Sequence, residues 1–429
     1  MIINFSVENW GSFKNRASLN MTAGQERQHR ERTCVAKNKL RLLPVAAIYG
    51  ANAAGKTKLI QALSFLQDLI VRGVPVDDRI SVNRFRLDPN CLQSPAKFSI
   101  DLLLDEKIYS YRISLTTDYV AEESLTIEES RIAYDVFKRV HGQEIKFDED
   151  FFKADRLGFM RVIAQAARDN QPFITTAVQL KAEEFSPLYK WLAEKLTILT
   201  PHSSFVAINR FADVSDALNR EMVELTKRLG TGIEHFEAQL IHDASSRNIP
   251  ESLIEEIKSK LLKGGVKSIR YQDLYIRREN DELVIQRLVA VHKDCNGKDI
   301  PFLLKDESDG TQRLIDLVPL FVSLCHPTNQ VYVIDELDRS LHTQLLEWLL
   351  TYYLDSCSSE SRNQLIFTTH DVNLLTQDIF RRDELWGVDK NTFGASELYS
   401  FRDFKNIRSD KNIRKQYLNG LLGAVPDLG

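Results

Sequence analysis

The sequence lacks any apolar run long enough to cross a membrane. Its richest apolar stretch, residues 314–325, is interrupted by Asp316 and Pro319, whereas a transmembrane helix needs about 20 apolar residues. The first residues, MIINFSVENW, contain no basic region followed by a long apolar one, so we expect no secretory signal. The five cysteines lie far apart without a CxxC pair. This spacing argues against a disulfide framework or a zinc site and favours a cytoplasmic protein without a membrane partner.

A large excess of charge of either sign is also missing. The 429 residues carry a formal net charge of −4, which neither supports nor excludes nucleic acid as a partner. Hydrophobic residues make up 43% of the chain and charged residues 27%, values typical of a globular protein. The length suffices for two domains, or for one domain with a large insertion.

Hydrophobic periodicity predicts an α/β fold. Residues 2–7 alternate as in a strand, and residues 43–49 form a short apolar run typical of a buried parallel strand. Residues 56–69 then show helical spacing, with Leu59, Ile60, Leu63, Leu66 and Ile70 on one face. Residues 98–104 and 108–115 predict a hairpin with Asp105 and Glu106 in its turn.

Helical patterns dominate the middle of the chain. They cover residues 159–167, 187–199, 215–229 and 251–262, and we interpret this region as a mostly helical insertion or lid. Strand-like alternation returns at residues 274–292 and 299–304, and residues 311–369 predict the order helix, strand, helix, strand.

The segment GANAAGKT at residues 50–57 fits the P-loop pattern GxxxxGK[ST], between a predicted strand and a predicted helix. Its glycines let backbone N–H groups turn toward a phosphate, and the helix N-terminus adds partial positive charge. Lys56 would reach the β- and γ-phosphates, and the Thr57 hydroxyl would bind Mg²⁺. The predicted phosphate cradle consists of Gly50, Asn52, Ala53, Ala54, Gly55, Lys56 and Thr57.

A second apolar strand, residues 330–334, runs into Asp335 and Glu336. Carboxylates at the end of a parallel strand lie at the ligand-binding edge of the sheet. Asp335 would orient Mg²⁺ through its water shell, and Glu336 would polarise the water that attacks the γ-phosphate. Many strands end in solvated carboxylates, but the P-loop upstream favours the catalytic interpretation.

Two further segments are candidates for contact with the nucleotide. A third apolar strand, residues 365–369, ends at His370, which could hydrogen-bond the γ-phosphate or serve only as a structural side chain. Ser308, Asp309, Gly310 and Thr311 precede an apolar helix, where they could form a second anion site or simply a capped helix start. Their order along the chain favours nucleotide contact for both segments.

This ordered set resembles the Walker A, signature, Walker B, D-loop and H-loop motifs of ABC ATPases. SDGT at residues 308–311 resembles the LSGGQ signature, although Asp309 stands where that consensus has glycine. The resemblance makes residues 337–341 the D-loop, with Asp338 at the nucleotide, and makes Lys56, Glu336 and His370 the catalytic residues. No Q-loop glutamine is assigned; Gln93 lies in roughly the right region.

More than half of the chain separates the P-loop from the signature, a split typical of the RecF, SMC and OLD-like branch. The opening NFSVENWGSFKNR is similar to the first strand and turn of that branch. The resemblance implies one composite ATPase domain with a mixed sheet, formed by residues 1–140 and 271–400. Residues 141–270 would be the helical insertion, and residues 401–429 a C-terminal tail.

The sequence is most similar to the AAA_15/AAA_21 ATPases of prokaryotic defence loci, of the RloA and AbiL kind. The similar segments are GANAAGKTKLI, ESDGTQRLIDLVPLF, VIDELDRSLH, FTTHDVNLL and the tail from ELWGVDK to the C-terminus. The resemblance implies a homodimer at minimum, with higher oligomers open, that binds ATP and Mg²⁺ between its protomers and hydrolyses the ATP. It also implies control of an effector from the same locus, an RloB-like or Toprim nuclease, in anti-phage defence.

Other functions stay open at this point. A RecF- or SMC-like DNA clamp would need basic surfaces; residues 27–41 carry six Lys or Arg against one acid, and residues 258–278 seven against one. Both stretches could equally be solvated surface. An OLD-type nuclease is disfavoured because few residues follow His370, and a transporter subunit because of the long insertion. The basic stretch 402–415 could dock a partner or pack on the ATPase core.

Overall fold

The structure is a computed structural model that describes residues 1–130, 132–201, 217–240, 268–271, 274–279, 282–404 and 413–423. The chain divides into two compact units. The first contains Met1–Pro201, Pro327–Asp338 and Leu350–Gly429; the second contains His202–His326 and Arg339–Leu349. Across the described ranges, every helix is too short or too polar to span a membrane.

A six-stranded sheet in the first unit carries the predicted nucleotide motifs. Its strand order is β11-β17-β18-β5-β19-β20, and β11, β17, β18, β5 and β19 run parallel while β20 is antiparallel. The predicted buried strands are confirmed, because every residue of β5, β17 and β18 is buried. The strands are β5 (Val45–Tyr49), β11 (Leu196–Leu199), β17 (Val331–Ile334), β18 (Gln364–Thr368), β19 (Leu385–Lys390) and β20 (Ser396–Ser400).

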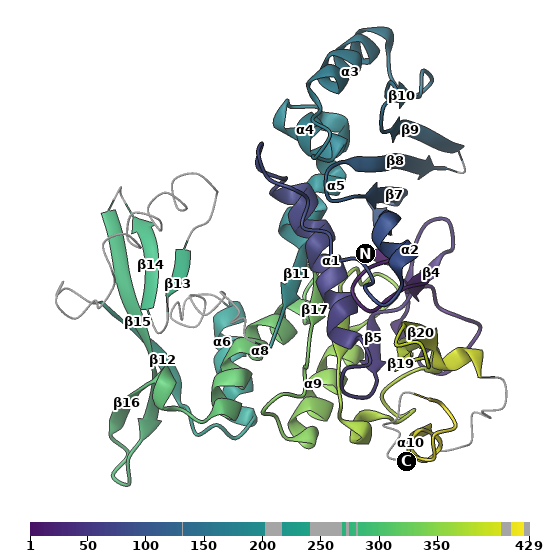
Figure 1. Cartoon of the computed structure of the whole chain (residues 1–429). Coiled ribbons are helices and arrows are strands. Elements are labelled where there is room, and N and C mark those ends of the chain that lie inside the picture. Colours follow the sequence, from purple (N-terminus) through teal and green to yellow (C-terminus); the bar gives the residue numbers. More distant parts are fainter. Residues whose placement is uncertain are drawn as a thin grey trace. The chain divides into compact units, whose positions relative to one another are not determined.

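Helix α1 (Lys56–Val71) follows β5 and lies along this sheet (Figure 1). The residues predicted to share its apolar face are all buried in one cluster with Ala46 and Ile48 of β5. Removing such side chains from water stabilises the fold by roughly 1.5–3 kcal/mol for each large one. The predicted helix is therefore confirmed, two residues longer than its pattern indicated. The helix that follows β17 is α9 (Thr343–Ser356).

A second sheet of the first unit has the order β10-β9-β8-β7-β6-β1-β2 and is antiparallel throughout. The predicted hairpin is confirmed, with Asp105 and Glu106 both at positive φ in a two-residue turn. The side chain of Gln364 links the two sheets, accepting from Ile2 N at 2.6 Å and donating to Ile2 O at 3.0 Å. The strands are β1 (Ile2–Glu8), β2 (Ala17–Asn20), β6 (Ala96–Leu104), β7 (Lys107–Leu115), β8 (Val120–Glu129), β9 (Ile132–Val140) and β10 (Lys146–Phe147). A separate two-stranded sheet consists of β3 (Cys34–Val35) and β4 (Arg41–Leu42).

The helix predicted over residues 187–199 is partly wrong. The chain forms α5 (Ser186–Lys190) and one π-helical turn, Trp191–Lys195, and then becomes the edge strand β11. The Gln67 amide donates to Leu192 O at 2.7 Å and to Leu196 O at 2.8 Å, so α1 satisfies carbonyls at the turn and just beyond it. Other helices of this unit are α2 (Pro89–Gln93), α3 (Ala154–Ala166), α4 (Phe173–Gln179) and η2 (Glu183–Phe185).

The second unit combines two packed helices, α6 (Ala217–Arg228) and α8 (Asp309–Cys325), with an antiparallel sheet. The His326 Nε2 and Glu221 Oε2 atoms lie 2.8 Å apart and join the two helical segments. The strand pattern predicted over 274–292 is confirmed as the two strands β14 and β15, and the pattern over 299–304 is confirmed as β16. The sheet contains β12 (His235–Leu240), β13 (Ser268–Tyr271), β14 (Leu274–Glu279), β15 (Glu282–Lys293) and β16 (Asp299–Leu303). The helix predicted over 251–262 lies outside the described residues, and the sequence-based domain division stays a prediction.

The described part of the C-terminal tail packs on the first unit. In α10 (Ile413–Leu418), the ring of Tyr417 lies 6.0 Å from that of Tyr49, the last residue of β5. Tyr399 Oη donates to Leu422 O at 2.9 Å, and Leu422 is fully buried. Residues 413–423 therefore pack on the core of this unit, whereas residues 405–412 of the basic stretch lie outside the described residues, and both interpretations of that stretch stay predictions.

Candidate functional site

The predicted P-loop connects β5 to α1 through two residues at positive φ, a region that glycine adopts readily and alanine rarely. Gly55 has φ +124° and Ala53 has φ +61°. A Cβ atom on Gly50 would lie 2.5 Å from Val388 O, so β19 leaves room for nothing larger than glycine there. Lys56 Nζ donates to Gly50 O at 2.7 Å and to Ala51 O at 3.1 Å. The carbonyl groups of the P-loop thus hold the Lys56 side chain folded back over the loop.

Two serines support this loop from behind. The Ser396 hydroxyl donates its one proton to Ala54 O and can accept from the Ser12 hydroxyl, whose Oγ lies 2.7 Å away; Ser396 N donates to Ser12 O at 2.7 Å. A Cβ on Gly55 would lie 2.3 Å from Ser396 Oγ and 2.8 Å from Ser12 Oγ. The loop therefore rests on the turn after β1 and on the start of β20. Nothing in the sequence pattern singled out Ser12 or Ser396.

Strand register brings the acidic pair to the same edge. Ile334 of β17 pairs with Phe367 of β18, so Asp335 emerges beside Thr368. The Thr368 hydroxyl donates to Asp335 Oδ1 at 2.6 Å, and Glu336 N donates to Thr368 Oγ1 at 2.8 Å. Asp335 is 1% exposed, whereas Glu336 is half-buried and has φ +53°. Thr368 therefore positions both predicted acidic residues, a role that sequence analysis did not assign to it.

His370 and Asp338 complete the cluster. Thr368 pairs with Ile48 of β5, so the chain after β18 leaves the sheet beside the P-loop. His370 Nδ1 lies 3.5 Å from Lys56 Nζ, and the backbone N–H of His370 donates to Asp338 Oδ2 at 3.2 Å. The other carboxylate oxygen of Asp338 is buried without a partner among the described residues. An unpaired buried oxygen is available to a donor from a ligand or from another chain.

The electrostatics of the cluster follow from burial among mixed charges. Burial lowers the pKa of Lys56 to about 8, against the opposing effect of the carboxylates of Asp335, Asp338 and Glu336. Burial also lowers the pKa of His370, and the nearby Lys56 ammonium lowers it further. At neutral pH Lys56 is thus the cation of the site and His370 a neutral imidazole. One phosphate oxygen could accept from both side chains at once.

The side-chain oxygens at this sheet edge fit a nucleoside triphosphate bound with Mg²⁺. Thr57 is exposed at the start of α1, and Asp335 lies under the same edge. Mg²⁺ in such sites takes one or two hard oxygen ligands from the protein and the rest from phosphates and water.

The predicted signature residues belong to the second unit. Ser308 is the N-cap of α8, and its Oγ accepts from Thr311 N at 3.1 Å. Asp309 is the first residue of α8. A Cβ on Gly310 would lie 2.9 Å from Ser340 O, so the helix start lies against the backbone of the predicted D-loop. This geometry fits both a capped helix and an anion site, and the role of these four residues stays a prediction.

The structure therefore brings together Gly50, Asn52, Ala53, Ala54, Gly55, Lys56, Thr57, Asp335, Glu336, Asp338 and His370 in one unit. Gln93 is exposed at the end of α2, and within the described residues no hydrogen bond joins it to this cluster. In the basic stretch 27–41, Arg32 pairs with Asp355 at 2.8 Å, so part of its charge is already neutralised.

A family model described as "AAA domain, putative AbiEii toxin, Type IV TA system", AAA_21, matches residues 45–376. A search of curated proteins finds no match. Among solved structures, the Smc head bound to the C-winged helix domain of ScpA is 13% identical, covers 93% of this chain and 97% of its own, and has a TM-score of 0.42. The SMC head domain from Thermotoga maritima is 13% identical with coverage of 93% and 98% and a TM-score of 0.38. The Pyrococcus furiosus Smc head with an extended coiled coil, bound to the C-terminal domain of ScpA, is 13% identical with coverage of 98% and 99% and a TM-score of 0.41.

Proposed function

We propose that this chain, which belongs to the AAA_21 family of AAA domains, binds ATP with Mg²⁺ in the cytoplasm and hydrolyses it as a nucleotide-driven switch. One observation carries the proposal: Lys56, Asp335, Glu336 and His370 follow three adjacent parallel strands and gather at one sheet edge. Ligands bind at the carboxyl ends of such strands. The family match over most of the chain supports the same conclusion.

Each residue has a distinct task in this mechanism. Backbone N–H groups of the P-loop and the Lys56 ammonium bind the β- and γ-phosphates. Thr57 and Asp335 would hold Mg²⁺, which would neutralise charge on the phosphate oxygens. Glu336 accepts a proton from the attacking water, and His370 donates a hydrogen bond to the γ-phosphate. Ser308 and Gly310 of a second copy contact the same phosphate, so that ATP joins two protomers across a symmetric interface.

The test separates binding from turnover. Lys56→Ala should lose nucleotide binding, measured with a fluorescent ATP analogue. Glu336→Gln should bind ATP with near wild-type affinity and form ATP-dependent dimers, but hydrolyse ATP at least 100-fold more slowly, within the range of general-base effects. Glu122→Gln, an exposed change on β8, is the matched control. Wild-type hydrolysis by Glu336→Gln would refute the assignment of the base.

We further propose that the switch controls an effector protein, a nuclease of the RloB-like or Toprim kind from the same locus, in anti-phage defence. The support is the family description, which names a toxin of a type IV toxin–antitoxin system. Cells that carry the locus should restrict phage, and cells that carry it with Lys56→Ala should not. Equal plating efficiency of phage on both strains would refute this role while leaving the ATPase assignment intact.

A further inference from the structure

A cavity of about 670 Å³ lies at the opposite edge of the nucleotide-binding sheet. Leu196, Val331 and Gln364, the first residues of β11, β17 and β18, are in register. Three lining residues, Lys195, Asn329 and Arg362, come one or two residues before these strand starts. Since each strand rises about 3.3 Å per residue, the cavity is separated from the nucleotide edge by roughly 20 Å. A molecule bound here leaves the nucleotide edge free.

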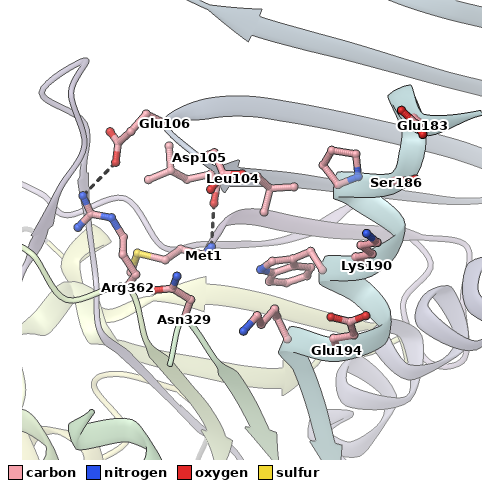
Figure 2. Close-up of a pocket in the computed structure, with 14 residues that line it drawn as sticks. Met1, Leu104, Asp105, Glu106, Glu183, Ser186, Lys190, Glu194, Asn329 and Arg362 are labelled. Atoms are coloured by element: carbon pink, nitrogen blue, oxygen red, sulfur yellow. Dashed lines mark hydrogen bonds and ion pairs between the residues drawn. The ribbon is translucent and has the colours of Figure 1, made fainter. Parts of the chain in front are cut away.

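Two structures form the walls of the cavity (Figure 2). The hairpin turn at Asp105 and Glu106 lies on one side, and the helical segment with Glu183, Lys190 and Glu194 on the other. The second wall includes the π-helical turn, Trp191–Lys195. Turns of this type occur often at functional sites, because they persist only where surrounding contacts stabilise them.

Some of the charged side chains that line the cavity have hydrogen-bond or ion-pair partners, and others have none. Arg362 is paired with Glu106 at 3.0 Å, and Lys195 Nζ donates to Thr328 O at 3.1 Å. Within the described part of the chain, the exposed carboxylates of Asp105, Glu183 and Glu194 have no hydrogen bond or ion pair of any kind. The exposed Lys190 is the one lining side-chain cation in the same condition, since Lys195 has its carbonyl partner. Three such carboxylates against one ammonium favour a cationic ligand. Among the described residues, these carboxylates form no cluster that could hold a metal ion.

Trp191 adds a requirement for an oxygen acceptor. This lining side chain is 6% exposed, and its indole N–H is buried without an acceptor among the described residues. A buried donor without a partner destabilises a fold by about 1–3 kcal/mol. A backbone carbonyl would satisfy this donor, and a second carbonyl could accept from Lys190. A polyamine offers cationic groups but no acceptor oxygen, whereas a basic peptide offers both.

We propose that this cavity docks a segment of a partner protein whose Lys or Arg side chain meets Asp105 and Glu194 while its backbone carbonyl accepts from the Trp191 indole. The cavity volume lies within the range of pockets that enclose a small ligand or a few residues of peptide. Because the cavity shares strands but no residues with the nucleotide site, docking and ATP binding occur on the same sheet at the same time.

The test measures binding of two fluorescein-labelled pentapeptides to the full chain by anisotropy. The first is Gly-Leu-Arg-Leu-Gly with a C-terminal amide, and the second carries Glu in place of Arg. We expect the arginine peptide to bind at least ten-fold more tightly, with an affinity that falls as salt is raised. The double variant Asp105→Asn with Glu194→Gln should bind it at least ten-fold more weakly, and Trp191→Phe several-fold more weakly. Asparagine suits position 105 because it tolerates positive φ.

Glu122→Gln is the matched control and should leave peptide binding unchanged, and all variants should bind the ATP analogue like the wild type. Equal binding of both peptides, no binding of either, or unchanged binding by the double variant would overturn the proposal. Competition by spermidine without any binding of the arginine peptide would overturn the peptide assignment in favour of a free polyamine. Lys56→Ala should lose ATP binding but should bind the arginine peptide like the wild type. A failure of the peptide proposal can therefore be distinguished from a failure of the proposed ATPase function.

Discussion

Replacing Glu384 by glutamine should make the first unit more stable at alkaline pH. Glu384 ends the turn before β19 and is 1% exposed. Its Oε2 accepts from Arg381 N at 2.8 Å, while its Oε1 is buried without a partner among the described residues. Arg381 is already paired with Asp383 at 2.8 Å. Burial, with the nearby Asp383 charge, raises the pKa of Glu384 from 4.5 to about 8.

The sign of the effect follows from proton uptake on folding. Between pH 4.5 and about 8 the unfolded chain has ionised Glu384, whereas the folded chain keeps its proton. Stability therefore falls as pH rises through this window, by about 1.4 kcal/mol per pH unit for one proton. Over the whole window the loss is on the order of 5 kcal/mol. Glutamine mimics the protonated acid in shape and charge, so the variant should not show this loss.

The assay is equilibrium unfolding in urea between pH 5 and pH 9, followed by tryptophan fluorescence. Wild type and Glu384→Gln should have similar midpoints at pH 5, and the variant should become several kcal/mol more stable by pH 8. Glu360→Gln, at an exposed position, is the control and should follow the wild-type curve. Stability curves of wild type and Glu384→Gln that run parallel from pH 5 to pH 9 would refute the burial argument.

Three further predictions concern the P-loop and the core. Ser396→Ala removes two hydrogen bonds that support the loop, each worth about 1 kcal/mol, and should weaken ATP binding roughly ten-fold by titration without unfolding the protein. ATP affinity should decline as pH rises above about 8, because neutral Lys56 no longer attracts phosphate; a flat dissociation constant from pH 7 to pH 9 would contradict this. Glu123→Ala should destabilise the first unit by about 3–5 kcal/mol in urea unfolding, because it removes the buried carboxylate 3.7 Å from the 5% exposed Arg139 and leaves it the exposed Asp169 at 3.8 Å. Glu122→Ala, at the exposed neighbouring position, should change the free energy of unfolding little.

The sequence predicted those elements whose signal is local. The strand before the P-loop and helix α1 were recognised because their apolar periods agree with their structure. The segment 187–199 shows where local pattern fails. Its apolar residues fit helical spacing, but Leu196–Leu199 pairs in parallel with β17, and this tertiary contact decides its conformation.

The residues of the candidate site likewise fall into those that a local sequence pattern predicts and those that only the structure reveals. The P-loop, the acidic pair and His370 were found because each follows an apolar strand in a recognisable order. Ser12, Ser396 and Thr368 were missed because small hydroxyl side chains carry no motif, and only the register of distant strands gives them their contacts. The burial of Glu384 and Glu123 was equally invisible, since nothing local distinguishes them from the many exposed glutamates of the chain.

Register also explains why one sheet can present two different surfaces. Each of β17 and β18 is only four or five residues long, begins at the cavity and ends at the nucleotide cluster. A slip of one residue between them would move Asp335 away from Thr368 and also shift Asn329 relative to Arg362. The hydrogen bond that orients the acidic pair and the wall of the cavity therefore depend on the same pairing. A partner that holds Asn329 and Arg362 in place would stabilise the register on which Asp335 depends, and this gives the cavity a physical route to the nucleotide site.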